Sequence, residues 1–439
     1  MSRRRAAHQS EAITPSVFRW PTCVNDLVGR WQAALASRYM SEYDVAGVRA
    51  RFPALDEGAA HFDGPGGSQV PDVVADAVAG ALRSAVANRG TVTSAERRAD
   101  RIVVEARRAA ADLLGAECIV FGRSMTQLTY DLARALAKQW HAGDEIVVSR
   151  LDHDANIRPW LHAAQGRGVA VRWAEFDPRT GELPVEAVEV TERTRLVAVT
   201  AASNLLGTRP DVATIAKRAH RVGALVYVDG VHFAPHCFVD VAAMGADFFA
   251  CSPYKFLGPH LGLVGASAQL LESVRPDKLL PMTDAVPERF ELGTLPYELL
   301  AGTTAAIDFL AALVPAVPVS GSRRQRLETS MRALQTHEAG LRERLETGLG
   351  DLDGVTVHGS PRRRRTPTVL FSVAGHTPAA VHEHLARRGV NAPAGSFYAP
   401  ECARHLGLGD AGAVRAGISP YTDCADVDRL LDGLADLPR

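Results

Sequence analysis

The feature that most constrains the fold is an alternation of short apolar strands with helical segments over roughly 170 residues. The expected strands lie in ECIVFG, EIVVS, VAVRWAEF, TRLVAVTAA, ALVYVD and ADFFAC, and helical periodicity separates several of them. Strands that alternate with helices pair in parallel and bury both faces of their sheet. The sequence therefore predicts an α/β fold with a mainly parallel sheet between helices.

Two polar residues follow two of these strands. Asp229 ends ALVYVD, and Lys255 lies in the turn SPYK directly after ADFFAC. In one sheet, residues at the strand ends share a ligand crevice. Pyridoxal 5'-phosphate (PLP) needs such a pair, because a lysine holds it as a Schiff base and a carboxylate keeps its ring nitrogen protonated. On spacing alone, a surface lysine and an unrelated aspartate explain the residues at least as well.

The rest of the chain suggests three further parts. Residues 1–39 resemble nothing downstream and are expected to be a flexible extension. Residues 40–60 are expected to pack with a smaller α+β domain at 301–439, and residues 61–300 to form the large domain. Helices are predicted at 72–87, at 95–114 with Ser94 as N-cap, at 211–222, at 323–349 and at 424–436. The loop AHFDGPGGSQVP, rich in Gly and Pro, is expected to lie close to another part of the molecule.

Composition excludes several classes of function. The formal net charge of −1 argues against a protein that grips nucleic acid or anionic membrane. Six cysteines without a CxxC pair indicate neither a metal site nor a disulfide framework. The longest apolar run, AAIDFLAALVPAV, is interrupted by Asp308 and Pro315, so no membrane span is predicted, and no apolar core follows the N-terminal arginines. A cytoplasmic enzyme is expected.

Six short motifs stand in a familiar order: LDHDANIRPW, TAASNLLGT, YVDGVHFAPH, CSPYKFLGP, FELGTLP and VRAGIS. Through them the chain, from about Tyr43 to its end, resembles the class V aminotransferase family, and above all its cysteine desulfurase branch. The resemblance implies a fold-type I PLP enzyme with a seven-stranded sheet in its large domain. It also implies a homodimer with the active site at the subunit interface and a small amino-acid substrate.

The resemblance assigns roles around the cofactor. Lys255 corresponds to the Schiff-base lysine and Asp229 to the partner of the pyridine nitrogen. His153 aligns with the histidine that stacks on the ring and acts in catalysis. Asn204 aligns with the side chain near the phenolic oxygen, and His232 replaces a glutamine that faces the same oxygen.

A second group is assigned to the phosphate and the substrate. Met125, Thr126 and Ser252 align with phosphate-binding residues, whereas Tyr254 replaces the usual histidine. Thr294 resembles a residue that reaches the neighbouring subunit's phosphate. The resemblance further assigns the substrate to Asn88 and to Arg415, whose fork suits a carboxylate. The run Arg362 to Arg365 is interpreted as a solvated loop before a strand, with a polyanion site as the alternative.

The sequence departs from the desulfurases at the mobile loop APAGSFYAPECARHLGL. A desulfurase needs a thiolate there, but the nucleophile's place falls on Tyr398, which cannot accept sulfur. Cys402 follows four residues later and could serve only in a rebuilt loop. Tyr398 is expected either to close over the substrate, to donate a proton, or to pack beneath the loop.

A lyase-type reaction on an amino acid or cysteine conjugate is therefore predicted, by β-elimination or C–S cleavage. Transamination, epimerisation and sulfur transfer through Cys402 stay open as alternatives. So does a PLP-binding protein without catalysis, although such a protein has no use for Arg415.

Overall fold

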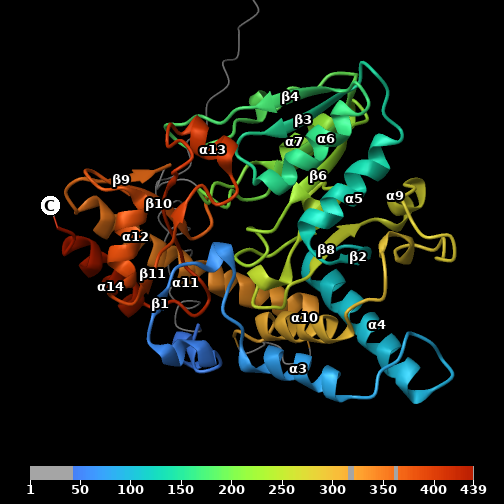
Figure 1. The fold of residues 1–439 in the computed structure, drawn as a ribbon, viewed down its shortest axis with the longest axis horizontal. Coiled ribbons are helices and arrows are strands. Elements are labelled where there is room, and N and C mark those ends of the chain that lie inside the picture. The colour runs from blue at the N-terminus through green and yellow to red at the C-terminus, as the bar shows by residue number, and fades with distance from the viewer. Residues whose placement is uncertain (1–42, 315–320, 360–363, 439) are drawn as a thin grey trace, which may run out of the picture.

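The strands of the alternating region form one sheet of seven strands in the computed structural model, which describes residues 43–314, 321–359 and 364–438 (Figure 1). The predicted extension at 1–39 lies outside the described residues. The strand order is β2 (Cys118–Gly122), β8 (Gly262–Ala266), β7 (Phe248–Cys251), β6 (Leu225–Asp229), β5 (Thr194–Thr200), β3 (Glu145–Ser149) and β4 (Ala170–Ala174). Only the pairs made by β8 are antiparallel, so the prediction of a mainly parallel sheet is confirmed.

Both faces of this sheet are buried because apolar residues occupy successive positions of its strands. In β6, Val226 and Val228 join the core on one face, and Tyr227 joins the core on the other. The first face packs against α4 (Ser94–Leu114), α7 (Val212–Arg221) and α10 (Tyr297–Leu310). The second packs against α5 (Met125–Ala137), α6 (Arg158–Gln165) and α9 (Ala268–Ser273). The short helix α8 (Val241–Met244) connects β6 to β7.

A second, antiparallel sheet has its own core. Its order is β12 (Ala394–Gly395), β13 (Ala413–Gly417), β10 (Thr368–Val373) and β9 (Val355–His358). Val369 and Phe371 of β10 pack with residues of α11 (Arg323–Gly350), α12 (Pro378–Ala386) and α14 (Cys424–Ala435). In Figure 1 this group of elements lies beside the large sheet, and α3 (Asp72–Arg83) runs along α10.

The N-terminal segment contacts the C-terminal one. The Tyr43 hydroxyl donates to the Pro420 carbonyl at 2.7 Å, and Arg49, which ends α2 (Val45–Arg49), pairs with Asp426 at 2.6 Å. Strand β1 (Ala60–His61) pairs in parallel with β11 (Val390–Asn391). The domain limits stay a prediction, and α10 runs through the limit placed between residues 300 and 301.

Two local predictions are wrong. Helix α4 is capped by Thr93 rather than Ser94, because Thr93 Oγ1 accepts from Glu96 N and the Glu96 carboxylate accepts from Thr93 N. The solvated loop predicted at Arg362 to Arg365 agrees with the exposure of Arg364, and Arg362 and Arg363 lie outside the described residues. It is wrong for Arg365, which is buried, pairs with Glu346 of α11 at 2.9 Å and donates to the Leu206 carbonyl. The ion pair and the carbonyl make its burial possible.

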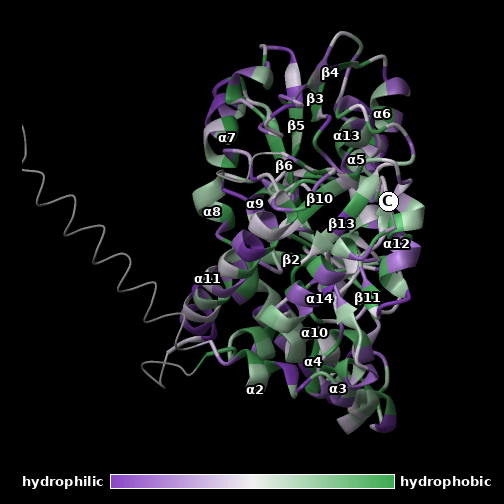
Figure 2. Cartoon of the chain, turned by 90° about the vertical axis from the view of Figure 1, so that its left-hand side faces the viewer, coloured by the Kyte–Doolittle hydropathy of each residue, from purple (hydrophilic) through white to green (hydrophobic). Residues whose placement is uncertain are grey.

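Hydrophilic residues alternate with hydrophobic ones along the outer helices, as on α7 and α12 (Figure 2). In the part of the chain that the structure describes, no helix combines the length and the hydropathy needed to cross a bilayer.

Candidate active site

The site lies where the parallel strands of the large sheet end. Thr200 of β5, Asp229 of β6 and Ala250 of β7 stand side by side in register. Lys255 follows β7 in the one-turn helix η5 (Pro253–Lys255). These strand ends form the floor of a cavity of about 250 Å³, as expected for a crevice at the carboxyl edge of such a sheet.

Most of the predicted site residues line this one cavity: Lys255, Asp229, His232, His153, Asn204, Ser252, Met125, Thr126, Tyr398 and Arg415. Thr294 and Asn88 do not. They lie together around a separate cavity of about 390 Å³. Within one chain, the structure therefore does not bring Thr294 or Asn88 to the cofactor pocket.

Lys255 and Asp229 are shifted toward their neutral forms. Burial lowers the pKa of Lys255 to about 7, with Arg415 adding to the shift and Asp229 opposing it. Burial raises the pKa of Asp229 to about 6, although the hydrogen bond from Val231 N and the charge of Lys255 both lower it. Lys255 Nζ donates to the Pro65 carbonyl. An amine that loses its proton near neutral pH can act as a nucleophile or a base.

His153 begins the short helix η3 (Asp154–Asn156) after β3. Its Nδ1 accepts a hydrogen bond from Ala155 N at 3.0 Å, so the proton of the neutral ring is on Nε2. Burial lowers the pKa of His153 to about 4, and the charges of Lys255 and Arg415 add to this. The ring is therefore neutral and can lie against an aromatic cofactor.

The start of α5 forms the other end of the cavity. Ser124 caps this helix through Gln127 N, which leaves the N–H groups of Met125 and Thr126 available to a phosphate. A Cβ at Gly262 of β8 would stand 2.2 Å from Ser124 C and 2.4 Å from Met125 N, so glycine lets the helix start rest on the sheet. Tyr254, in place of the usual histidine, stacks on His260 with centroids 4.7 Å apart.

Arg415 of β13 enters the cavity from the second sheet. Its Nη1 donates to the Asn204 carbonyl at 3.0 Å, and the Phe397 ring lies 3.7 Å from the guanidinium carbon. Burial lowers the pKa of Arg415 to about 9, opposed by Asp63. Its Nε and Asn204 Oδ1 are buried without a hydrogen-bond partner among the described residues. A buried polar atom without a partner lowers stability unless a ligand bonds to it. The Arg415 Nε–H therefore suits an anionic group of a ligand, and Asn204 Oδ1 suits a hydrogen-bond donor.

Phe397 and Tyr398 form the mouth of the cavity in a strained turn. Their φ angles are +52° and +55°, a region that costs a non-glycine residue about 1 kcal/mol or more. Asn204 Nδ2 donates to the Phe397 carbonyl, and Asp154 N donates to the Tyr398 carbonyl. The Tyr398 side chain is not packed beneath the loop: it is 78% exposed and stacks on His153.

Cys402 lies in α13 (Pro400–His405), the helix that follows this turn. Its side chain is fully buried, and burial raises the pKa of its thiol, with Asp152 adding to the shift. A buried thiol with a raised pKa is a poor nucleophile.

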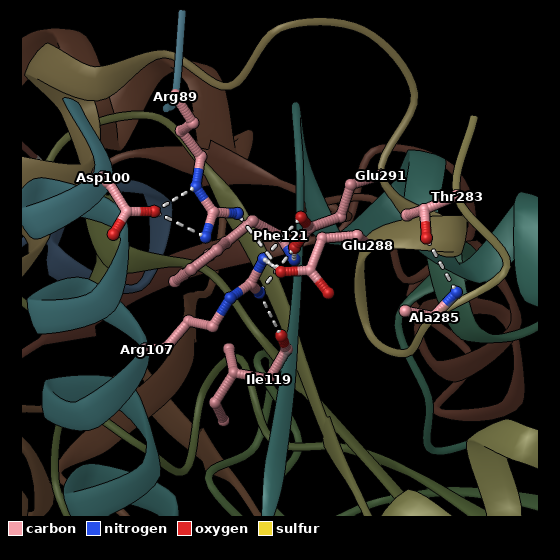
Figure 3. A network of polar contacts seen from close by, with 9 residues as sticks. All are labelled: Arg89, Asp100, Arg107, Ile119, Phe121, Thr283, Ala285, Glu288 and Glu291. Atoms are coloured by element: carbon pink, nitrogen blue, oxygen red, sulfur yellow. Dashed lines mark hydrogen bonds and ion pairs between the residues drawn. The ribbon is translucent and has the colours of Figure 1, made fainter. Parts of the chain in front are cut away.

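A polar network fixes the segments that carry Asn88 and Thr294 (Figure 3). Arg89 pairs with Asp100 and with Glu288, and Arg107 of α4 pairs with Glu291 at 2.7 Å. The Glu291 carboxylate also accepts from Phe121 N of β2 at 2.8 Å. Asn88 and Thr294, each close in sequence to a member of this network, therefore have defined positions.

Sequence reasoning missed Phe397 and the direct role of the loop at Gly64–Gly66. The sequence predicts only that this loop lies close to another part of the molecule. In the structure, its Pro65 carbonyl accepts a hydrogen bond from Lys255, and Gly66 lies against Arg415 Nη2. Its Gly and Pro content could have identified it. Nothing in the sequence indicates that Phe397 covers Arg415, because that contact joins two separate stretches of the second domain.

Comparison with known proteins supports the resemblance. The family described as Aminotransferase class-V matches residues 60–430. An uncharacterized protein of Mycobacterium tuberculosis is 37% identical over 401 residues, which cover 90% of this chain and 99% of that protein. An aminotransferase-like protein of Gibberella zeae, FGM3, is 32% identical, with 90% and 98% covered.

Among solved structures, the cysteine desulfurase CsdA of Escherichia coli superposes with a TM-score of 0.78 at 28% identity, covering 89% of this chain and 97% of CsdA. The predicted family, fold class and cofactor are thereby confirmed. The chain belongs to the class V aminotransferase family and is a PLP-dependent, cysteine desulfurase-like enzyme.

Proposed function

We propose that the enzyme catalyses a lyase-type reaction, a β-elimination or C–S cleavage, on an amino acid or cysteine conjugate. One observation carries this proposal. The acid, the amine and the carboxylate clamp of the family share one cavity, while the nucleophile's position holds the exposed ring of Tyr398 and the nearby Cys402 is buried. The cavity can hold an amino acid, and among the described residues no accessible thiol lines it to take up sulfur.

The residues would divide the work as follows. Bound PLP withdraws electrons from the substrate's Cα. Asp229 would face the pyridine nitrogen, Lys255 would hold the cofactor covalently, and the start of α5 would hold its phosphate. Arg415 would bind the substrate carboxylate through its guanidinium, whose Nε has no hydrogen-bond partner among the described residues.

Proton movement would use Lys255. Once the substrate's amino group has replaced Lys255 on the cofactor, the freed amine, with a pKa of about 7, would take the Cα proton onto Nζ. The Cβ–S bond then breaks with its electron pair on sulfur, which leaves as a thiol after protonation. Hydrolysis of the released enamine gives pyruvate and ammonia. Tyr398 stands at the mouth, where its hydroxyl can protonate the leaving sulfur or its ring can cover the substrate.

The partner subunit is part of the proposal. Thr294 lies outside its own chain's cofactor cavity, so its predicted phosphate contact requires a second copy. A homodimer would bring the cavity near Asn88 and Thr294 of one chain to the cofactor pocket of the other. We likewise propose a cytoplasmic location.

A substrate screen tests the proposed reaction. Purified enzyme with PLP is incubated with amino acids and S-substituted cysteines, and pyruvate, ammonia, sulfide and keto acids are measured. Pyruvate and ammonia in equal amounts, unaffected by Cys402→Ala, are expected. Sulfide release that is lost in Cys402→Ala would indicate a desulfurase. Transfer of the amino group to a keto acid would indicate an aminotransferase, and the absence of any turnover would indicate a PLP-binding protein without catalysis.

A further inference from the structure

His232 occupies a position whose hydrogen-bonding character depends on the location of one proton. The ring lines the cofactor cavity and is buried at 3% exposure. Its Nε2 lies 2.9 Å from Thr368 Oγ1 and 3.0 Å from Thr366 Oγ1. Its Nδ1 has no hydrogen-bond partner within the described residues and is the nitrogen left for a ligand.

Both threonines come from the start of the second sheet, and their backbone is firmly held. Arg365 Nε donates to the Leu206 carbonyl, and its Nη2 donates to the Thr368 carbonyl, each at 2.8 Å. Glu346 of α11 neutralises this guanidinium. Gly207, at φ +74°, approaches so closely that a Cβ there would stand 2.9 Å from the Thr366 carbonyl oxygen.

The hydroxyl protons decide the tautomer of His232. Thr366 Oγ1 has the Gly207 carbonyl as an acceptor at 3.3 Å. Thr368 is fully buried, and His232 Nε2 is the only acceptor that its hydroxyl meets within the described residues. A buried hydroxyl proton without an acceptor lowers the stability of the fold. Both threonine hydroxyl protons have an acceptor only if Thr366 donates to the Gly207 carbonyl and Thr368 donates to His232 Nε2. A neutral ring with an acceptor Nε2 carries its proton on Nδ1.

We infer that Thr368 is a positioning residue that fixes His232 as the Nδ1–H tautomer. His232 thereby becomes a hydrogen-bond donor toward the cofactor's ring oxygen. The ring contact rests on the proposed cofactor site, but the tautomer does not. Thr366 can take over if the Thr368 hydroxyl is lost, because it lies 3.0 Å from the same nitrogen. Only removal of both hydroxyls frees the ring.

The tautomer is measured directly by ¹⁵N NMR of histidine-labelled full-length protein, before and after PLP is added, with His232→Gln to assign the signal. A proton on Nδ1 is expected in both states. A proton on Nε2 in the wild-type protein would overturn the inference, and this reading needs no threonine variant and no functional cofactor site.

The variants test the consequence for the cofactor. Thr366→Val/Thr368→Val removes both hydroxyls, and Thr366→Ser/Thr368→Ser keeps them. We expect the PLP dissociation constant to rise about 10-fold in the valine pair, with a shift of the bound cofactor's absorption maximum, and to change less than about 2-fold in the serine pair. Equal behaviour of the two pairs would contradict the inference. If the valine pair fails to fold, the ¹⁵N measurement on the wild-type protein decides alone, and a proton on Nε2 there overturns the inference.

Discussion

Lys255 and Asp229 show how one physical cause acts oppositely on a cation and an anion. Burial disfavours the charged form of each, so the pKa of Lys255 falls to about 7 and that of Asp229 rises to about 6. The lysine side chain is therefore ready to react near neutral pH. In its proposed role as partner of the pyridine nitrogen, the carboxyl group would be most effective above pH 6, where it is ionised.

The lowered pKa predicts how PLP capture depends on pH. A lysine with a pKa of about 7 is mostly protonated at pH 6 and mostly neutral at pH 8. The rate of covalent PLP incorporation into the cofactor-free protein should rise about 10-fold over this range and then level off. Stopped-flow absorbance measures it. A rate that keeps rising to pH 10 would show an unperturbed lysine.

Arg415 has a buried Nε–H group without a hydrogen-bond partner among the described residues. If the guanidinium binds the substrate carboxylate as proposed, its planar fork should matter more than its charge. Arg415→Lys keeps the charge but loses two-point binding, and kcat/KM should fall about 10- to 100-fold, mostly through KM. Arg404→Lys, at a side chain more than half exposed and paired with Asp410, is the control and should stay near wild type. Similar values for both variants would remove Arg415 from substrate binding.

Within single strands and helices, short sequence motifs are enough to predict the site residues that lie at strand ends or helix starts. Strand ends place Asp229 and Lys255, and a helix start places Met125 and Thr126, so short motifs suffice to predict them. The sequence predicts a solvated Arg365 because nothing nearby in the chain reveals its partners, Glu346 and the Leu206 carbonyl. Likewise Thr366, Thr368 and Phe397 reach the site only through the packing of the second sheet on the first.

The contact between β8 and the start of α5 yields a prediction. Gly262→Ala places a methyl group against the backbone of Ser124 and Met125, which should displace the phosphate site. The variant should lose about 1–3 kcal/mol of unfolding free energy and bind PLP at least about 10-fold more weakly. Gly350→Ala, at the end of α11 with open space around it, is the matched control. Urea denaturation and fluorescence titration provide the two measurements, and unchanged PLP affinity in Gly262→Ala would contradict this account.

In the molecule as a whole, the cofactor cavity is lined by residues of both sheets. Lys255 and Asp229 come from the large sheet, and Arg415 and the mouth residue Tyr398 come from the second domain. In the proposed homodimer, Thr294, held near the Arg107–Glu291 pair, would complete the site of the partner subunit.

Subunit mixing tests that interface. Lys255→Ala should be inactive and Thr294→Val should bind PLP weakly, because each site would lack one partner. When the two are mixed under exchanging conditions, one site per heterodimer should contain Lys255 of one chain and Thr294 of the other. Activity at limiting PLP should then exceed the sum of the separate variants. Strict additivity, with exchange verified by tag pull-down, would place Thr294 outside the partner's site.

The central claim is that Lys255 holds PLP over the end of the large sheet. It is tested most directly by reducing the PLP-loaded protein with borohydride and mapping the modified peptide by mass spectrometry. This account predicts one phosphopyridoxyl group per chain, on Lys255, and none in Lys255→Ala. A group on another lysine, or an unmodified Lys255 at saturating PLP, would contradict it.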